Sequence, residues 1–152
     1  MTTAEPTPIH SSRDARVEAP PRRSTLSIVL WIVQVLLALL FIWAGGFKLV
    51  ASLEQLAGPP GSVVLPIAFL RFIGVAEFLG GVGLILPALL RIRPILTPLA
   101  AAGLVIIMIG AVGITFAGGG SIGMALIPAV TGLLAGSVAY GRWRLAPIRS
   151  KK

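Results

Sequence analysis

The longest uncharged segment of the chain runs from Pro94 to Gly141: PILTPLAAAGLVIIMIGAVGITFAGGGSIGMALIPAVTGLLAGSVAYG. None of its 48 residues is charged. As one helix it would extend about 72 Å at 1.5 Å per residue, far beyond the roughly 30 Å hydrocarbon core of a bilayer. The chain must therefore turn back, and the run from Gly118 to Ser121 is the strongest turn signal. We expect two transmembrane helices here, at about 94–116 and 122–140.

Two further apolar segments precede this pair. The 24 residues from Ser24 to Phe47 are uncharged and lie between Arg23 and Lys48, long enough for a first membrane-spanning helix at about 26–50. A turn rich in glycine and proline, 58–61, separates it from a second apolar segment, for which Pro66 offers a natural start. We place the second helix at about 67–90. Together the segments predict an all-α membrane protein, a four-transmembrane-helix bundle over residues 24–141.

The composition excludes a water-soluble domain and several kinds of site. Charged residues make up 12 % of the chain, about half of what a soluble domain carries, and the mean hydropathy is +0.96. There is no cysteine, and His10 is the single histidine, so thiolate metal sites, iron–sulfur clusters and bis-histidine haem are excluded. We expect no cofactor and no metal. The net charge of +8 lies at segment ends and not on a folded basic face, so nucleic acid is not an expected partner.

The basic residues predict how the helices are oriented in the membrane. Eleven of the 13 would share one side: Arg13, Arg16, Arg22 and Arg23 before the first helix, Arg91 and Arg93 between the second and third, and Arg142, Arg144, Arg149, Lys151 and Lys152 after the fourth. The positive-inside rule makes that side cytoplasmic, so both termini lie inside. Residues 1–23 are expected to be a disordered basic cytoplasmic tail, and 142–152 a second basic tail.

The polar residues inside the membrane fall on two narrow stripes. The stripe of the first helix has spacings of 4, 3, 4 and 3 and consists of Gln34, Ala38, Phe41, Gly45 and Lys48. The stripe of the second helix has spacings of 3, 4, 3 and 4 and consists of Gly74, Glu77, Gly81, Leu84 and Ala88. Small residues on both stripes let two helices approach closely, so we expect both to face the bundle interior. In the last two helices the pairs Gly103/Gly110 and Gly132/Gly136 are also expected to pack closely.

An ionised carboxylate in hydrocarbon needs a partner, a wet cavity or a proton, so Glu77 requires an explanation. Lys48 is the first candidate partner and Arg71 the second. The candidate intramembrane polar cluster is Gln34, Lys48, Arg71 and Glu77. It either fixes how two helices dock, or forms a polar pocket for a lipid headgroup, a quinone ring or a proton. No set of residues typical of a hydrolase or metalloprotease is present, and we expect no catalytic residues.

Two motifs carry a resemblance to a known family. The first helix ends in Phe41-Ile-Trp-Ala-Gly-Gly-Phe-Lys48-Leu, and the second contains Arg71-Phe-Ile-Gly74-Val-Ala-Glu77-Phe-Leu-Gly80-Gly81-Val-Gly83-Leu. With the short loop between them, the chain over about 26–141 resembles the DoxX-like family of small four-helix integral membrane proteins. The family's polar positions carry over onto Lys48, Arg71 and Glu77. A polar or histidine residue that many relatives bear late in the third helix is replaced here by Ile114, Thr115 and Phe116.

The resemblance implies a redox context. Some relatives are membrane subunits of thiosulfate:quinone oxidoreductases, and others belong to membrane-associated redox or oxidative-stress complexes. We therefore expect a non-catalytic accessory subunit or scaffold of a membrane-associated redox system, with quinone as a candidate link, in the bacterial plasma membrane. Its expected partners are the lipid bilayer, a redox-enzyme subunit, a quinone or lipid headgroup, and a second copy of the chain. The alternative is a small-solute or proton-coupled transporter that uses a buried Glu77.

Overall fold

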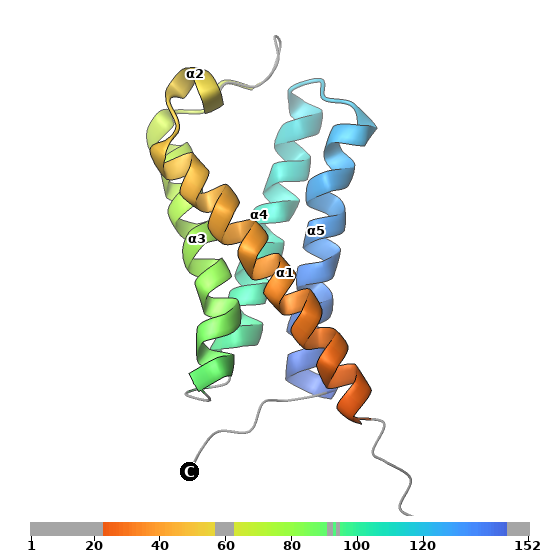
Figure 1. Cartoon of the computed structure of the whole chain (residues 1–152). Helices are drawn as coiled ribbons and strands as arrows, with labels where there is room; N and C mark the ends of the chain where they lie inside the picture. Colours follow the sequence, from red (N-terminus) through yellow and green to blue (C-terminus); the bar gives the residue numbers. More distant parts are fainter. Residues whose placement is uncertain (1–22, 57–62, 91–92, 94, 146–152) are drawn as a thin grey trace, which may run out of the picture.

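The computed structural model describes residues 23–56, 63–90, 93 and 95–145, and in these ranges the chain contains helices and no strand. The elements are α1 (Arg23–Val50), α2 (Leu53–Leu56), α3 (Ile67–Leu90), α4 (Leu96–Ala117), α5 (Ile122–Tyr140) and a short π-helix, η1 (Gly141–Leu145) (Figure 1). Four of the helices are long and apolar enough to cross a membrane. The predicted all-α fold with four transmembrane helices is therefore confirmed.

The helix ends differ from the expected ones in four places. α1 begins at Arg23, and α4 runs from Leu96 to Ala117 instead of over 94–116. α5 does not give way to a tail after Tyr140, because η1 continues the helical path to Leu145. The expected tail at 142–152 is therefore wrong for 142–145, and the reason is that Arg142 has buried partners within the bundle. The expected turn at 58–61 and the tails at 1–22 and 146–152 lie outside the described residues.

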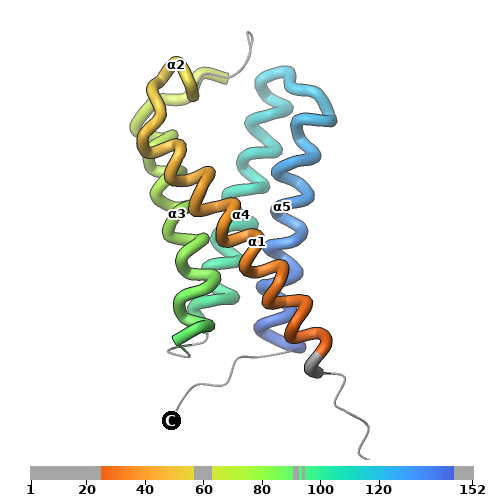
Figure 2. Tube along the Cα trace, in the orientation of Figure 1, coloured from red at the N-terminus to blue at the C-terminus, as the bar shows by residue number. Residues whose placement is uncertain are grey.

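The helices form two antiparallel pairs. α1 runs at a slant along α3, α4 runs alongside α5, and α3 also packs on α4 (Figures 1 and 2). The start of α1 and the end of η1 lie at one end of the bundle, here called the terminal side. α2 and the turn between α4 and α5 lie at the opposite end, called the loop side. In that turn Gly119 has φ +70°, a left-handed conformation that glycine adopts without strain. The Ser121 side chain accepts a hydrogen bond from the backbone N–H of Met124 at the start of α5.

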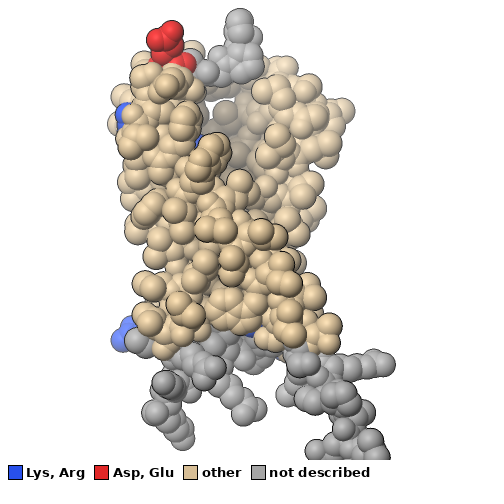
Figure 3. All heavy atoms as spheres, viewed as in Figure 1, with Lys and Arg blue, Asp and Glu red and all other residues tan. Residues whose placement is uncertain are grey.

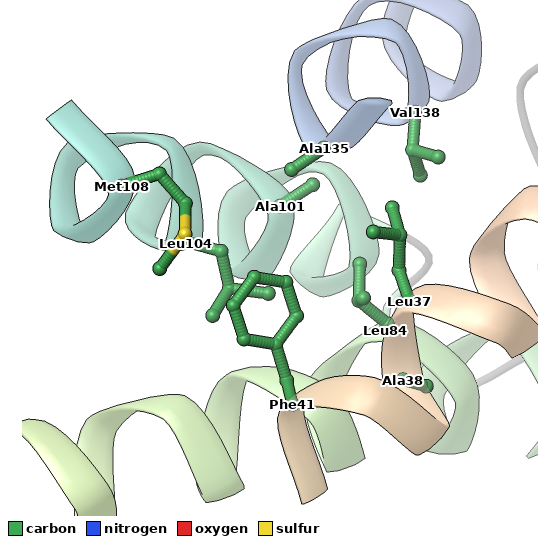
Figure 4. Close-up of a cluster of buried hydrophobic side chains, with 9 residues drawn as sticks. All are labelled: Leu37, Ala38, Phe41, Leu84, Ala101, Leu104, Met108, Ala135 and Val138. Carbon is green, nitrogen blue, oxygen red and sulfur yellow. The ribbon is translucent and has the colours of Figure 1, made fainter. Parts of the chain in front are cut away.

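The apolar core is formed by side chains from all four long helices (Figure 4). Its buried members are Leu37, Ala38, Phe41, Leu84, Ala101, Leu104, Met108, Ala135 and Val138. These positions belong to the middle and the terminal half of the bundle. Toward the loop side the two helix pairs separate, and the surface is hollowed between them (Figure 3).

The glycines of α4 and α5 differ in how closely a neighbouring helix packs against them. The buried stripe of α4 consists of Thr97, Pro98, Ala101, Leu104 and Met108. Gly103 and Gly110 lie off this stripe, and a Cβ added to either would meet nothing within 4 Å, so the expectation that they pack closely is wrong. Gly132 of α5 does pack closely, because its Cβ would lie 3.0 Å from the Cβ of Met108. Gly136 makes only an ordinary contact, at 3.8 Å from Val105.

The orientation of the bundle is a prediction that cysteine labelling can check, because the chain has no natural cysteine. Glu54 of α2 and Arg144 of η1 are both exposed and lie at opposite ends of the bundle. With the terminal side in the cytoplasm, Glu54→Cys should react with a membrane-impermeant maleimide in intact cells. Arg144→Cys should react only after permeabilisation. The reverse pattern would contradict the orientation given by the positive-inside rule.

Candidate functional site

α1 and α3 touch through their backbones at a glycine crossing. A Cβ added to Gly45 would lie 2.6 Å from both the carbonyl oxygen of Gly74 and the backbone nitrogen of Phe78. A Cβ on Gly81 would lie 2.9 Å from the carbonyl oxygen of Ala38. No side chain larger than hydrogen fits at these distances, so glycine is what lets the two helices meet. The two stripes predicted from the spacing do face each other, and all their residues are buried except the partly exposed Lys48.

The crossing brings the two opposite charges together. Lys48 and Glu77 each lie three residues after the glycine of their own helix, and Lys48 Nζ lies 2.6 Å from Glu77 Oε2. Glu77 is 4 % exposed, whereas the Lys48 side chain is 27 % exposed. Charge-assisted hydrogen bonds of this length are among the stronger ones, and the contact removes the need for a bare carboxylate in hydrocarbon. The structure thus pairs Glu77 with the first of its two expected partners.

Arg71 has a different role from the one considered for it. Its Nη1 donates to the carbonyl oxygen of Lys48 at 2.6 Å, and its Nη2 donates to that of Ala51 at 2.8 Å. The last carbonyl groups of a helix have no partner within the helix, and a cation there also interacts favourably with the helix dipole. Arg71 therefore caps the C-terminal end of α1 from α3, and among the described contacts it does not bind Glu77.

Gln34 does not lie with the other three residues of the predicted cluster. It is 14 residues before Lys48 on the same helix, about 21 Å away along the axis. Fully buried, it donates through Nε2 to the carbonyl oxygen of Leu84 and accepts at Oε1 from Arg142 Nε, at 3.0 Å. The expected single cluster is therefore two: a loop-side cluster of Lys48, Arg71 and Glu77, and a terminal-side cluster of Gln34 and Arg142.

Arg142 is a buried polar residue that the sequence analysis does not single out. It was counted among the basic residues of a tail, but it is only 4 % exposed and lies over the ring of Trp31, with 5.3 Å from Cζ to the ring centroid. A signal was present in the helical spacing. Thr131, Ala135 and Val138 form the buried stripe of α5, and the next position on that stripe is residue 142.

The loop-side cluster lies in the half of the bundle where the helix pairs separate (Figure 1). Lys48 and Arg71 are the described basic residues of this half of the bundle, and basic atoms are visible at the edge of the hollow (Figure 3). An ammonium group has three donors, of which one is used by Glu77. Among the described residues no three His, Cys, Asp or Glu side chains gather as a metal site would require. The arrangement therefore offers hydrogen-bond donors to a group that enters the hollow.

The glycine crossing makes a prediction with a neighbouring control. Gly45→Ala should lower the free energy of unfolding in mixed micelles by about 2 kcal/mol, because the new methyl group overlaps the backbone of α3. Gly46→Ala is the matched control, since a Cβ there meets nothing within 4 Å, and its effect should stay within about 0.5 kcal/mol. Equal effects of the two substitutions would contradict the close contact.

The ion pair is tested by a double-mutant cycle. Lys48→Met or Glu77→Leu alone should lower the free energy of unfolding by about 3 kcal/mol, because each leaves a charge without its partner in the membrane. The double variant should lose less free energy of unfolding than the two single variants lose together, and the difference, the coupling energy, should be about 1 to 2 kcal/mol. Unfolding by sodium dodecyl sulfate titration measures this, and strict additivity would show that the pair contributes nothing.

Comparison with known proteins places the chain in a family. A family model described as DoxX-like family matches residues 32–138, more than two thirds of the chain. No curated protein and no solved structure matches. The matched range contains both glycine-crossing segments and the residues Gln34, Lys48, Arg71 and Glu77, and it ends before Arg142. With its four membrane-spanning helices, this chain belongs to the DoxX-like family.

Proposed function

We propose that this protein is a non-catalytic accessory subunit, a scaffold within a membrane-associated redox system of the bacterial plasma membrane. The redox context, with its link to quinone, rests on the resemblance of the two motifs. The scaffolding role rests on one observation: the charged groups of the loop-side cluster already bind one another or the backbone. Glu77 is paired with Lys48, and both terminal nitrogens of Arg71 are held by the end of α1.

This arrangement favours docking of helices over proton or solute chemistry. A general acid or base must exchange its proton with a reacting group, and a carrier carboxylate must release its partner in each cycle. Glu77 is buried at a distance of 2.6 Å from its partner, on a helix fixed by backbone contacts at two glycines. Such a pair supports a fixed geometry of α1 and α3, on which another subunit can assemble.

The apolar core is the second reason to prefer a scaffold over a transporter. A path across the membrane would lead from the loop-side cluster past Phe41, Leu84 and Leu104 to the terminal-side cluster, and these three side chains are each no more than 2 % exposed. Every member of that core is apolar. Ions and polar solutes need a wet or polar path, which supports the accessory role and weakens the alternative of a transporter that uses Glu77.

The hollow on the loop side is where we propose that a partner subunit docks. Lys48, on the same side of the bundle, is partly exposed and retains donors for a backbone carbonyl group of the partner. A quinone ring and a lipid headgroup carry acceptor oxygens of the same kind. The purification below distinguishes a partner subunit from a second copy of this chain. Both termini would lie in the cytoplasm and the docking side outside it.

Affinity purification from native membranes in a mild detergent tests the accessory role. The bait should recover a redox enzyme in a stoichiometric amount, identified by mass spectrometry. Glu77→Gln should recover several-fold less, because it removes the charge that holds Lys48. Glu54→Gln is the matched control, since Glu54 is an exposed acid of the same side, and it should recover as much as the wild type. Recovery of the bait alone, or with copies of itself only, would contradict the proposal.

A flux assay separates the scaffold from the transporter. Proteoliposomes that contain the wild-type protein should show the same proton and cation flux as proteoliposomes that contain Glu77→Gln. The physical reason is the closed apolar core between the two polar clusters. A flux that depends on Glu77, and not on Glu54, would favour the transporter instead.

A further inference from the structure

The terminal side of the bundle holds a buried cation with no anion beside it in the described part of the chain. Arg142 is 4 % exposed, and its nearest polar neighbours are Gln34 and Ser27. The described acidic residues are Glu54 and Glu77, and both belong to the loop half. Burying a charge without a counter-charge is expensive, whereas an anion at hydrogen-bond distance offsets much of that cost.

The hydrogen bonds of the guanidinium leave one edge without a partner among the described groups. Nε is anchored by its bond to Gln34 Oε1, and Nη1 reaches Ser27 Oγ only at 3.4 Å, a long and weak contact. Nη2 is buried and has no partner among the described groups. A guanidinium held at Nε presents Nη1 and Nη2 as a fork, which matches two oxygens of a phosphate or carboxylate group.

The position of Arg142 indicates the kind of anion. It lies on the last turn of the final membrane-spanning segment, next to Trp31, and a tryptophan near a helix end is typical of the membrane interface. Arg93 and Arg144 are exposed at the same end, so the local field attracts anions. Lipid phosphates lie at the membrane interface, where we expect the end of this segment to be. The hydroxyl of Thr97, at the start of α4, is a second buried polar group without a partner among the described residues of this end.

We propose that Arg142, oriented by Gln34 and flanked by Trp31, is the centre of a binding site for the phosphate group of an anionic phospholipid. The inference goes beyond the accessory role and does not depend on it, because it concerns the opposite end of the bundle. A bound phosphate completes the hydrogen bonds of the guanidinium and supplies its missing negative charge. A lipid held there would tie the ends of α1 and α5 to the bilayer.

Native mass spectrometry of the full chain, purified in a maltoside detergent and stripped of lipid, tests the site. The probes are phosphatidylglycerol, diacylglycerol with the same acyl chains, and inorganic phosphate. The wild type should bind phosphatidylglycerol at least about tenfold more tightly than diacylglycerol, as expected for charge-assisted hydrogen bonds to phosphate. Phosphatidylglycerol should also raise the Tm. If inorganic phosphate raises the Tm as much as phosphatidylglycerol does and competes with it for binding, the site binds phosphate, and the inference that its ligand is a lipid is wrong.

Three variants make the test specific. Arg142→Met should abolish the preference for phosphatidylglycerol over diacylglycerol. Arg142→Lys should retain part of it, because the charge remains and the fork is lost. Arg144→Met is the matched control, an exposed arginine of the same short helix, and should change binding by less than about twofold. Circular dichroism checks that each variant folds. If Arg142→Met does not fold, the partial loss of lipid preference expected for Arg142→Lys becomes the deciding result. Equal binding of both lipids by the wild type, or an equal effect of Arg144→Met, would overturn the proposal.

Discussion

The contact on which the rest of the structure depends is the backbone approach of α1 and α3 at Gly45 and Gly74. In a bilayer, lipid tails are as apolar as leucine, so apolar side chains alone do not drive two helices together. Close backbone packing and polar contacts must supply the specificity. The crossing supplies the first and positions the second, because Lys48 and Glu77 follow their glycines by the same three residues. Arg71 then fastens the end of α1 to α3.

The molecule has two polar clusters with an apolar core between them, and the two ends of the bundle differ as a result. On the terminal side, Gln34 links α1 to α3 through Leu84 and to η1 through Arg142, so three segments distant in sequence are joined. On the loop side, the bonds join α1 and α3 alone, and the pair of α4 and α5 stands apart across the hollow (Figure 3). The closed end suits a fixed anchor, and the open end suits a partner.

Helical periodicity was the most informative feature of the sequence. It placed the stripes of α1 and α3 correctly because only one face of each helix carries small and polar residues. The same reasoning failed in α4, where Gly103 and Gly110 share a face that meets nothing in the described bundle, since glycine spacing does not say which face has a neighbour. At Arg142 the wrong expectation comes from charge and not from periodicity, because a basic residue beyond an apolar helix resembles a tail unless the buried stripe is followed one turn further.

The number of membrane-spanning helices, their approximate ends and the inward faces of the first two can be read from the sequence alone. The reason is that hydrocarbon thickness and helical pitch constrain every apolar segment in the same way. Which polar groups meet depends on how the helices pack. Residues on one stripe can be 21 Å apart along a helix, so Gln34 and Lys48 share a face and not a site. The partner of Gln34 comes from residue 142, and only the packing of the end of α5 against α1 brings the two together.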